Sequence, residues 1–334
     1  MNRGFLFLLM LLSATTVLAQ TYPEDFIIPT PVQKPQSSLY RTIGFIDSRP
    51  REKMMNRKPK EVTSLPLDYQ LTRLMDSLTD STAKNGELFL QLRLFNYAEV
   101  TGNISQKGRC YLRAVLYAKK GDQYQKINSL DTAAAIQVSP NLSKGALANG
   151  GKILAMFIAD NLLKESTDST VYSLHDIKQI DSIEKQHTRL YTSKTYTDGV
   201  YMSYASFEDQ VPDDLIIKAD TTDSGNLFAV KVIRNGEKER IKPKDAYAAV
   251  YKGIPYIATK YGYYPIHKAG GDFFFTGDIE IKSDVGASVA NDVTYGVLGV
   301  ISSLGEEEKY DMELDHVNGQ FIRIVQINTD VVQF

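Results

Sequence analysis

The pattern of apolar and polar positions changes near residue 195. Before that point, several segments repeat apolar residues every three or four positions, which indicates helices with one buried face. After it, apolar and polar residues alternate in short runs bounded by glycine, which is typical of antiparallel strands. Residues 197–207 lie at this change, and the turn dipeptide Asp198–Gly199 favours a hinge between two globular halves.

The first half is predicted to combine helices with an antiparallel meander. Residues 66–78 place apolar side chains on one face of a helix, and Pro66 suits its first turn. Strands are expected at residues 42–47, 87–97, 108–118 and 124–138, and turn signals link the last three. Residues 141–164 are predicted to end in a helix that covers the meander, although Gly145, Gly150 and Gly151 weaken its first half.

Residues 173–191 are predicted to form one helix that links the two halves. Ser173 and Asp176 have the spacing of a capping pair. An apolar stripe follows at Leu174, Ile177, Ile180, Ile183 and Leu190. His175 and His187 are twelve residues apart, which is not a chelating spacing on one helix, so both are expected at the surface. A docking surface for a partner is the alternative role of this helix.

The second half is predicted to be built from short strands with regular glycine turns. The expected strands are residues 215–219, 226–234, 237–242, 246–251, 255–260, 263–268 and 273–281, followed by a hairpin of 311–317 and 320–327. Residues 285–304 are long enough to span a membrane, but Asn291–Asp292 near their middle makes such a span costly. A small-residue loop or helix that packs on the sheet is the favoured interpretation.

These elements predict an α+β protein. Residues 41–166 form an N-terminal α+β domain with an antiparallel meander, and residues 173–191 form the linking helix. Residues 196–334 form a C-terminal, mostly antiparallel β domain, either a sandwich or an open barrel.

The first nineteen residues have the three regions of a secretory signal peptide. Arg3 supplies a positive charge, residues 4–12 are apolar, and Val17 and Ala19 are the small residues that precede a cut after Ala19. The apolar run is too short for a bilayer core of about 30 Å, although an uncleaved N-terminal anchor is the alternative. Residues 20–40 are rich in Pro, Gln and Ser and are expected to form an extended arm.

The formal net charge of −2 is close to balance, so the composition does not indicate a nucleic-acid partner. Residues 49–60 hold six basic side chains and one acid. This segment is interpreted as a solvated loop, with a docking patch for an anionic partner such as lipid headgroups as the alternative. Cys110 is the only cysteine, which rules out an intramolecular disulfide, and its alternating context favours a buried thiol.

The sequence shows no recognised catalytic motif. Its four histidines form no zinc-binding pattern, and it has no nucleophile elbow and no phosphate-binding loop. No catalytic, cofactor-binding or metal-binding residue is therefore assigned. Asp131 is interpreted as a solvent-facing strand residue, although it could serve as a ligand or an acid. Carboxylates are plentiful, so a hydrolase acting on envelope polymer or glycan is the alternative function.

Tyrosine is abundant, with 20 residues, and many lie in the second half. A candidate recognition surface consists of Tyr201, Tyr204, Tyr256, Tyr261, Tyr263 and Tyr264. Tyr is enriched at interfaces because its ring packs while its hydroxyl stays hydrated, but it is also an ordinary strand residue.

Three motifs resemble uncharacterised exported proteins of the Bacteroidota type. These are Gly199-Val200-Tyr201 with Ser203 and Phe207, the strands around Gly262-Tyr263-Tyr264-Pro265 and Gly271-Asp272-Phe273-Phe274-Phe275, and the closing Leu314-Asp315-His316-Val317-Asn318-Gly319. In that family a "dGvY-x-s/t-x-x-x-F" segment opens a small β-rich domain of unknown function. The resemblance covers about residues 185–330 and implies no reaction. One departure is that the strand before Lys252–Gly253 lacks the expected Trp or Phe.

The sequence as a whole predicts an exported protein of the periplasm or cell surface that acts as a non-catalytic binding module. Its expected partner is an envelope protein or a glycan, and not a nucleic acid. The polar centre of residues 285–304 argues against integral membrane insertion.

Overall fold

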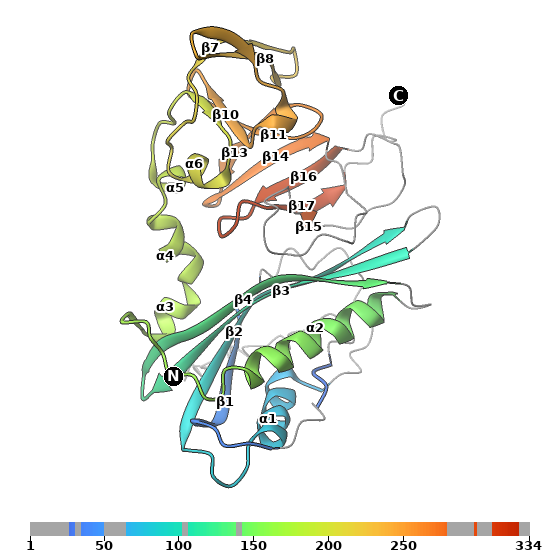
Figure 1. Ribbon diagram of the computed structural model, residues 1–334, viewed down its shortest axis with the longest axis vertical. Helices are drawn as coiled ribbons and strands as arrows, with labels where there is room; N and C mark the ends of the chain where they lie inside the picture. The colour runs from blue at the N-terminus through green and yellow to red at the C-terminus, as the bar shows by residue number, and fades with distance from the viewer. Residues whose placement is uncertain are drawn as a thin grey trace, which may run out of the picture.

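The computed structural model describes residues 27–30, 35–49, 65–101, 106–137, 142–278, 297–298 and 309–326. Within these residues it is an α+β protein with a β-rich C-terminal part (Figure 1). The expected signal peptide, the loop after Arg49 and most of residues 285–304 lie outside the described residues, although Val297–Leu298 forms the short strand β15.

The N-terminal part is a five-stranded sheet in the order β1-β2-β3-β4-β5. Its strands are β1 (Tyr40–Asp47), β2 (Gly86–Thr101), β3 (Gln106–Lys120), β4 (Gln123–Gln137) and β5 (Val171–Tyr172). β2, β3 and β4 form the predicted antiparallel meander. β1 instead pairs in parallel with β2, because helix α1 (Leu67–Leu78) lies in the connection and returns the chain to the same end of the sheet.

Helices α1 and α2 (Leu142–Ala159) cover one face of this sheet (Figure 1). Leu88, Leu90 and Leu92 of β2 point to this face and share one core with the apolar stripe of α1. Gly151 of α2 allows a close approach, because a Cβ there would lie 2.0 Å from the carbonyl oxygen of Ile27. The glycine that weakens the helix therefore lets the described part of the N-terminal arm pack on it.

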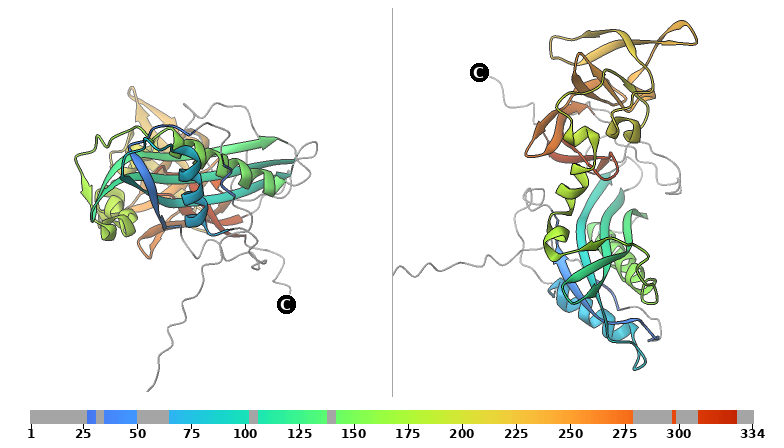
Figure 2. Two further views of the ribbon diagram at one scale, coloured as in Figure 1. Left: turned by 90° about the horizontal axis from the view of Figure 1, so that it is seen from below. Right: turned by 90° about the vertical axis from the view of Figure 1, so that its left-hand side faces the viewer.

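The predicted linking helix is wrong as a single helix. The chain forms α3 (Leu174–Lys178), α4 (Ile180–Gln186) and α5 (Arg189–Thr192), although the capping box of Ser173 and Asp176 is present. Ile177 packs with the N-terminal sheet, whereas Leu190 packs in the C-terminal core. One straight stripe could not face both, so the chain bends at Gln179 and near His187. These helices lie along the left side of the molecule in Figure 1, which is the side that faces the viewer in the right-hand view of Figure 2.

A seven-stranded sheet begins the C-terminal part. Its strands are β6 (Gly199–Tyr201), β7 (Ile216–Thr221), β8 (Leu227–Arg234), β9 (Glu237–Arg240), β10 (Ala248–Tyr251), β11 (Ile254–Ala258) and β12 (Tyr263–Pro265), with the 3-10 turn η2 (Pro243–Asp245) before β10. The order is β6-β10-β11-β12-β8-β7, and β9 pairs with β8. A β-bridge joins Val200 of β6 to Asp214, which lies just before β7. The first and last strands of the sheet therefore approach each other, and the sheet is nearly closed and barrel-like.

Residues 197–207 are not a hinge. Val200, Tyr201 and Phe207 are fully buried, and β6 and the short helix α6 (Tyr204–Glu208) belong to the C-terminal core. Burial of the apolar side chains in this stretch fixes it in the C-terminal core, although a turn dipeptide lies at its start. Asp198 does serve a turn, because its carboxylate accepts hydrogen bonds from the backbone N–H groups of Lys252 and Gly253.

A second sheet has the order β13-β14-β16-β17-β15. It contains β13 (His267–Ala269), β14 (Asp272–Asp278), β16 (Lys309–Leu314) and β17 (Phe321–Gln326). The single strand expected at 263–268 is thus divided between the two sheets. The second sheet packs on the barrel-like sheet through a core that includes Phe273, Phe275 and Phe321. Within the described residues, no helix is long and apolar enough to cross a membrane.

Candidate functional site

The densest group of charged side chains in the described residues lies where the two parts of the chain meet. It joins the face of the N-terminal sheet opposite to α1 and α2, helix α4, and the turn between β16 and β17. We call this group the junction network. Its members are Arg93, Arg113, Asp131, Asp181, Glu184, Asp315, His316 and Asn318.

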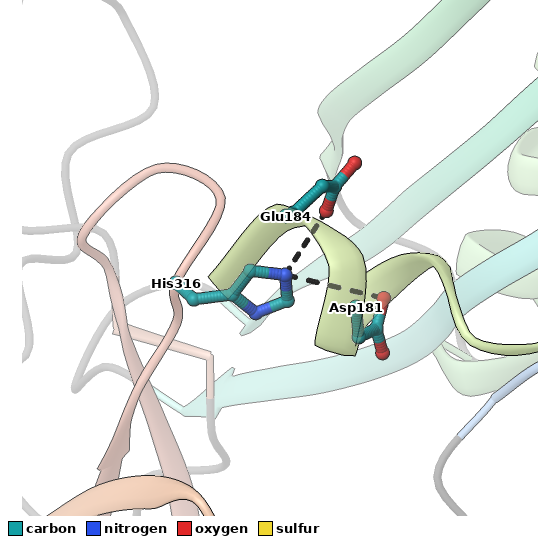
Figure 3. A group of neighbouring side chains, drawn as sticks. All are labelled: Asp181, Glu184 and His316. Atoms are coloured by element: carbon teal, nitrogen blue, oxygen red, sulfur yellow. Dashed lines mark hydrogen bonds and ion pairs between the residues drawn. The ribbon is translucent and has the colours of Figure 1, made fainter. Parts of the chain in front are cut away.

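The first half of the junction network is centred on Arg93 of β2. Its guanidinium binds Glu184 through two hydrogen bonds of 2.9 and 2.5 Å, and it lies 2.5 Å from Asp181 Oδ1. Asp181 and Glu184 are three residues apart on α4, so both side chains lie on one face of the helix. His316 approaches from the β16–β17 turn, with Nε2 3.0 Å from Glu184 Oε2 (Figure 3).

The second half is centred on Arg113 of β3. Its side chain is 8% exposed and binds Asp315, which is 2% exposed, through hydrogen bonds of 3.1 and 2.7 Å. Asp131 of β4 accepts from Arg113 at 3.0 Å and from the amide of Asn318 at 3.0 Å. Asp131 is exposed, as expected for a solvent-facing strand residue, and it also binds the β16–β17 turn through Asn318.

Three tyrosine hydroxyls hold the backbone of the β16–β17 turn. Tyr191 donates to the Leu314 carbonyl, Tyr204 to the His316 carbonyl and Tyr247 to the Gly319 carbonyl, at 3.4, 2.7 and 2.6 Å. Gly319 has a φ of +71°, and a Cβ there would lie 2.2 Å from the Tyr204 ring. The sequence Asn318–Gly319 thus makes a turn that fits closely against aromatic rings and presents Asp315 and His316 to the N-terminal sheet.

The charges of the junction network stabilise one another. Burial alone would raise the pKa of Glu184, but hydrogen bonds from His316 and Arg93 lower it to about 2. Burial likewise opposes the charge on Asp315, and the guanidinium of Arg113 outweighs it, so the pKa of Asp315 is lowered. The pKa values of both arginines are raised because their carboxylate partners outweigh the effect of burial. Glu184, Asp315, Arg93 and Arg113 are therefore charged at neutral pH.

Asp181, Glu184 and His316 offer ligand atoms within 4.8 Å of one another, a spacing that a metal ion could bridge. However, the guanidinium of Arg93 already lies 2.5 Å from an oxygen of each carboxylate. A divalent cation would have to share these oxygens with a fixed positive charge. In the intact protein, the carboxylates of Asp181 and Glu184 are consequently better suited to binding Arg93 than to binding a metal ion.

The tyrosines predicted to form a recognition surface lie mostly in the core. Tyr201, Tyr204, Tyr256, Tyr263 and Tyr264 are at most 6% exposed, and only Tyr261 reaches 42%. Their rings pack on other aromatics, as Tyr201 does on Phe207 at 5.2 Å between centroids. The hydroxyls of Tyr201, Tyr204 and Tyr264 form internal hydrogen bonds, such as that of Tyr264 to Asp278 at 2.8 Å. The prediction of a shared exposed surface for these six residues was therefore wrong.

The remaining predicted positions are spread over the molecule. His175, His187 and His267 are exposed, as expected for the first two. Cys110 lies in β3, and its side chain is outside the described residues. The junction network was not predicted from the sequence, although the sequence contains one indication of it. Arg93 and Arg113 interrupt apolar strands at positions whose neighbours are buried, and a buried arginine needs a carboxylate partner.

The chain was compared with protein-family models, with characterised proteins and with solved structures, and none of them matches it.

Proposed function

We propose that the protein is an exported envelope protein whose two parts act together as one non-catalytic binding module. The signal-peptide pattern of residues 1–19 supports export to the periplasm or the cell surface. The resemblance of residues 185–330 to exported proteins of the Bacteroidota type agrees with this location. The expected partner is an envelope protein or a glycan.

One observation carries the non-catalytic part of the proposal. In the densest charged cluster of the described residues each carboxylate is bound to an arginine, because Arg93 binds Asp181 and Glu184 while Arg113 binds Asp315 and Asp131. A catalytic acid must hold a proton near neutral pH, and the pKa of Glu184 is about 2. The network is thus suited to fixing the orientation of two parts, which is what a preorganised binding surface requires.

Two measurements test this proposal in the producing cell. The mass of the protein isolated from the envelope fraction should correspond to a chain that begins at Gln20, and an intact Met1 would contradict export by cleavage. Cross-linking in intact cells should attach a stoichiometric envelope partner to the wild type. The Arg93→Met variant should lose this partner if the orientation of the two parts matters. A Lys152→Met variant, altered at an exposed position of α2, serves as the matched control.

A hydrolase acting on envelope polymer is the second candidate, and one observation favours it. Burial raises the pKa of Glu208, while hydrogen bonds from His316 and Arg93 lower the pKa of Glu184. Carboxylates with opposite shifts are the arrangement that acid–base pairs use. Release of reducing sugar or peptide from purified envelope polymer, abolished by Glu208→Gln with unchanged thermal stability, would establish this function. No release by the wild type would end it.

A further inference from the structure

The three-stranded ladder of β7, β8 and β9 separates its side chains by chemical type. Val230 and Val232 of β8 and Ala219 of β7 point inward and are buried in the barrel-like sheet. Since successive side chains of a strand point to opposite faces, the residues between them point outward. These outward positions are exposed on all three strands.

The outward face combines aliphatic and basic side chains. Ile216 pairs with Val232 and, after a register shift, Lys218 pairs with Lys231. Leu215 therefore lies next to Ile233, and Ile217 lies at the shift beside Lys231. The pairing of β8 with β9 then places Lys238 beside Ile233 and Arg240 beside Lys231. We call this surface the distal patch, and it consists of Leu215, Ile217, Lys218, Lys231, Ile233, Lys238 and Arg240. The three aliphatic side chains are 43–69% exposed.

Asp214 and the two acids of β9, Glu237 and Glu239, lie on the other face. Arg234 binds Asp214 at 2.5 Å and Glu239 at 3.5 Å, and all three alternate with the residues of the distal patch. Glu237 pairs in register with Arg234 and shares that side. Asp220 of β7 is an outward acid, and it lies opposite Phe228 toward the other end of β7. Within the described residues, Lys231, Lys238 and Arg240 have no acidic partner. The distal patch is therefore cationic in a chain of net charge −2.

The position of the distal patch leaves it accessible to a large flat surface. Figure 1 places β7 and β8 at one end of the long axis of the molecule and the N-terminal sheet at the other. A surface that met the ladder end-on would not contact the N-terminal sheet. The patch is also remote from the junction network, which lies at the middle of the molecule.

We propose that the distal patch docks on the anionic headgroups of a lipid bilayer. Exposed aliphatic side chains flanked by Lys and Arg are the combination that binds the interfacial region of anionic membranes. Protein interfaces are instead depleted in Lys, and this patch has three lysines. Two copies of the patch would bring like charges together, which argues against self-association. The proposal rests on the proposed function, because it names the envelope surface on which an exported module would sit.

Vesicle flotation with the purified full chain tests this assignment. The probes are vesicles of phosphatidylcholine alone and vesicles that also contain phosphatidylglycerol. The wild type should float with the anionic vesicles and not with the neutral ones, and raised salt should weaken its binding. The variant K231Q/K238Q/R240Q should bind anionic vesicles about a hundred-fold more weakly, since each cation near such a surface contributes about 1 kcal/mol. A Leu215→Ser/Ile233→Ser variant should also bind more weakly.

The matched control removes three exposed lysines elsewhere, in the variant K152Q/K178Q/K194Q. It changes the net charge by the same three units. It also shares residues 1–19, so any contribution of these residues to binding cancels. Equal loss in both triple variants, equal binding to neutral vesicles, or binding to poly-glutamate without binding to anionic vesicles would each overturn the proposal. The purified protein needs neither cleavage nor a captured partner for this assay, so its result is independent of the two tests of the proposed function.

Discussion

Arg113 of β3 and Asp315 of the β16–β17 turn form a buried, bidentate ion pair, although they are 202 positions apart in the chain. The pair joins the N-terminal sheet to the C-terminal sheets, and Asp131 extends it to β4. A second group of ion pairs, centred on Arg93 of the neighbouring strand β2, lies beside this pair.

Removing one partner of the buried pair should destabilise the protein strongly. Arg113→Met leaves the Asp315 carboxylate buried without its cation, and the expected loss is about 3–5 kcal/mol of unfolding free energy. Urea denaturation of the variant and the wild type measures it. Lys119→Met is the matched control, because Lys119 lies on the same strand and forms a more exposed pair with Glu87. It should cost about 1 kcal/mol or less, and equal losses in both variants would contradict a special role for the buried pair.

The junction network should make stability depend on pH in the acid range. Glu184 has a folded pKa of about 2 against a reference value of 4.5, so the folded state favours its charged form. This stabilisation is fully present above about pH 4.5 and is lost as the pH falls toward 2. Because the Glu184 side chain is 39% exposed, solvent screening reduces its contribution to about 1 kcal/mol. The difference in unfolding free energy between the wild type and Glu184→Gln should shrink between pH 5 and pH 2, as measured by denaturation at each pH.

Gly319 should tolerate substitution poorly. Alanine there must adopt a φ of +71° and would place its Cβ 2.2 Å from the Tyr204 ring, which would displace the turn that carries Asp315 and His316. We expect Gly319→Ala to cost about 3 kcal/mol, from backbone strain and overpacking together. Gly236→Ala is the control, because its φ is +82° and its Cβ would meet no atom within 4 Å. It should cost only about 1 kcal/mol, and similar thermal shifts in both variants would show that the close contact has little effect.

Arg93 should determine whether the carboxylates of α4 can bind a metal ion. In the wild type, Zn²⁺ should leave the melting temperature unchanged, because the guanidinium holds Asp181 and Glu184. The Arg93→Ala variant frees both carboxylates beside His316, and Zn²⁺ should then raise its melting temperature by a few degrees. The further change His316→Ala should remove this response. A wild type that Zn²⁺ stabilises as strongly as the variant would mean that the arginine does not block the site.

Much of the fold could be predicted because its signals are local. The period of apolar residues predicts α1 and most strands, and the turn sequences predict the meander of β2, β3 and β4. The split of the linking segment into α3, α4 and α5 could not be predicted, because Ile177 and Leu190 face different cores that exist only in the folded protein. The parallel pairing of β1 with β2 also depends on the route of the chain around the sheet.

The sequence by itself determined the α+β class, the order of the main elements and the leader-like pattern of residues 1–19, since periodicity and turn chemistry are properties of neighbouring residues. Tertiary structure alone decided that five of the six candidate tyrosines are core residues and that Arg93 and Arg113 meet carboxylates from distant segments. It also decided that Lys231, Lys238 and Arg240 share a face with three aliphatic side chains. The reason is physical: burial and charge pairing depend on which segments lie side by side, and strand register, which no local pattern specifies, sets those neighbours.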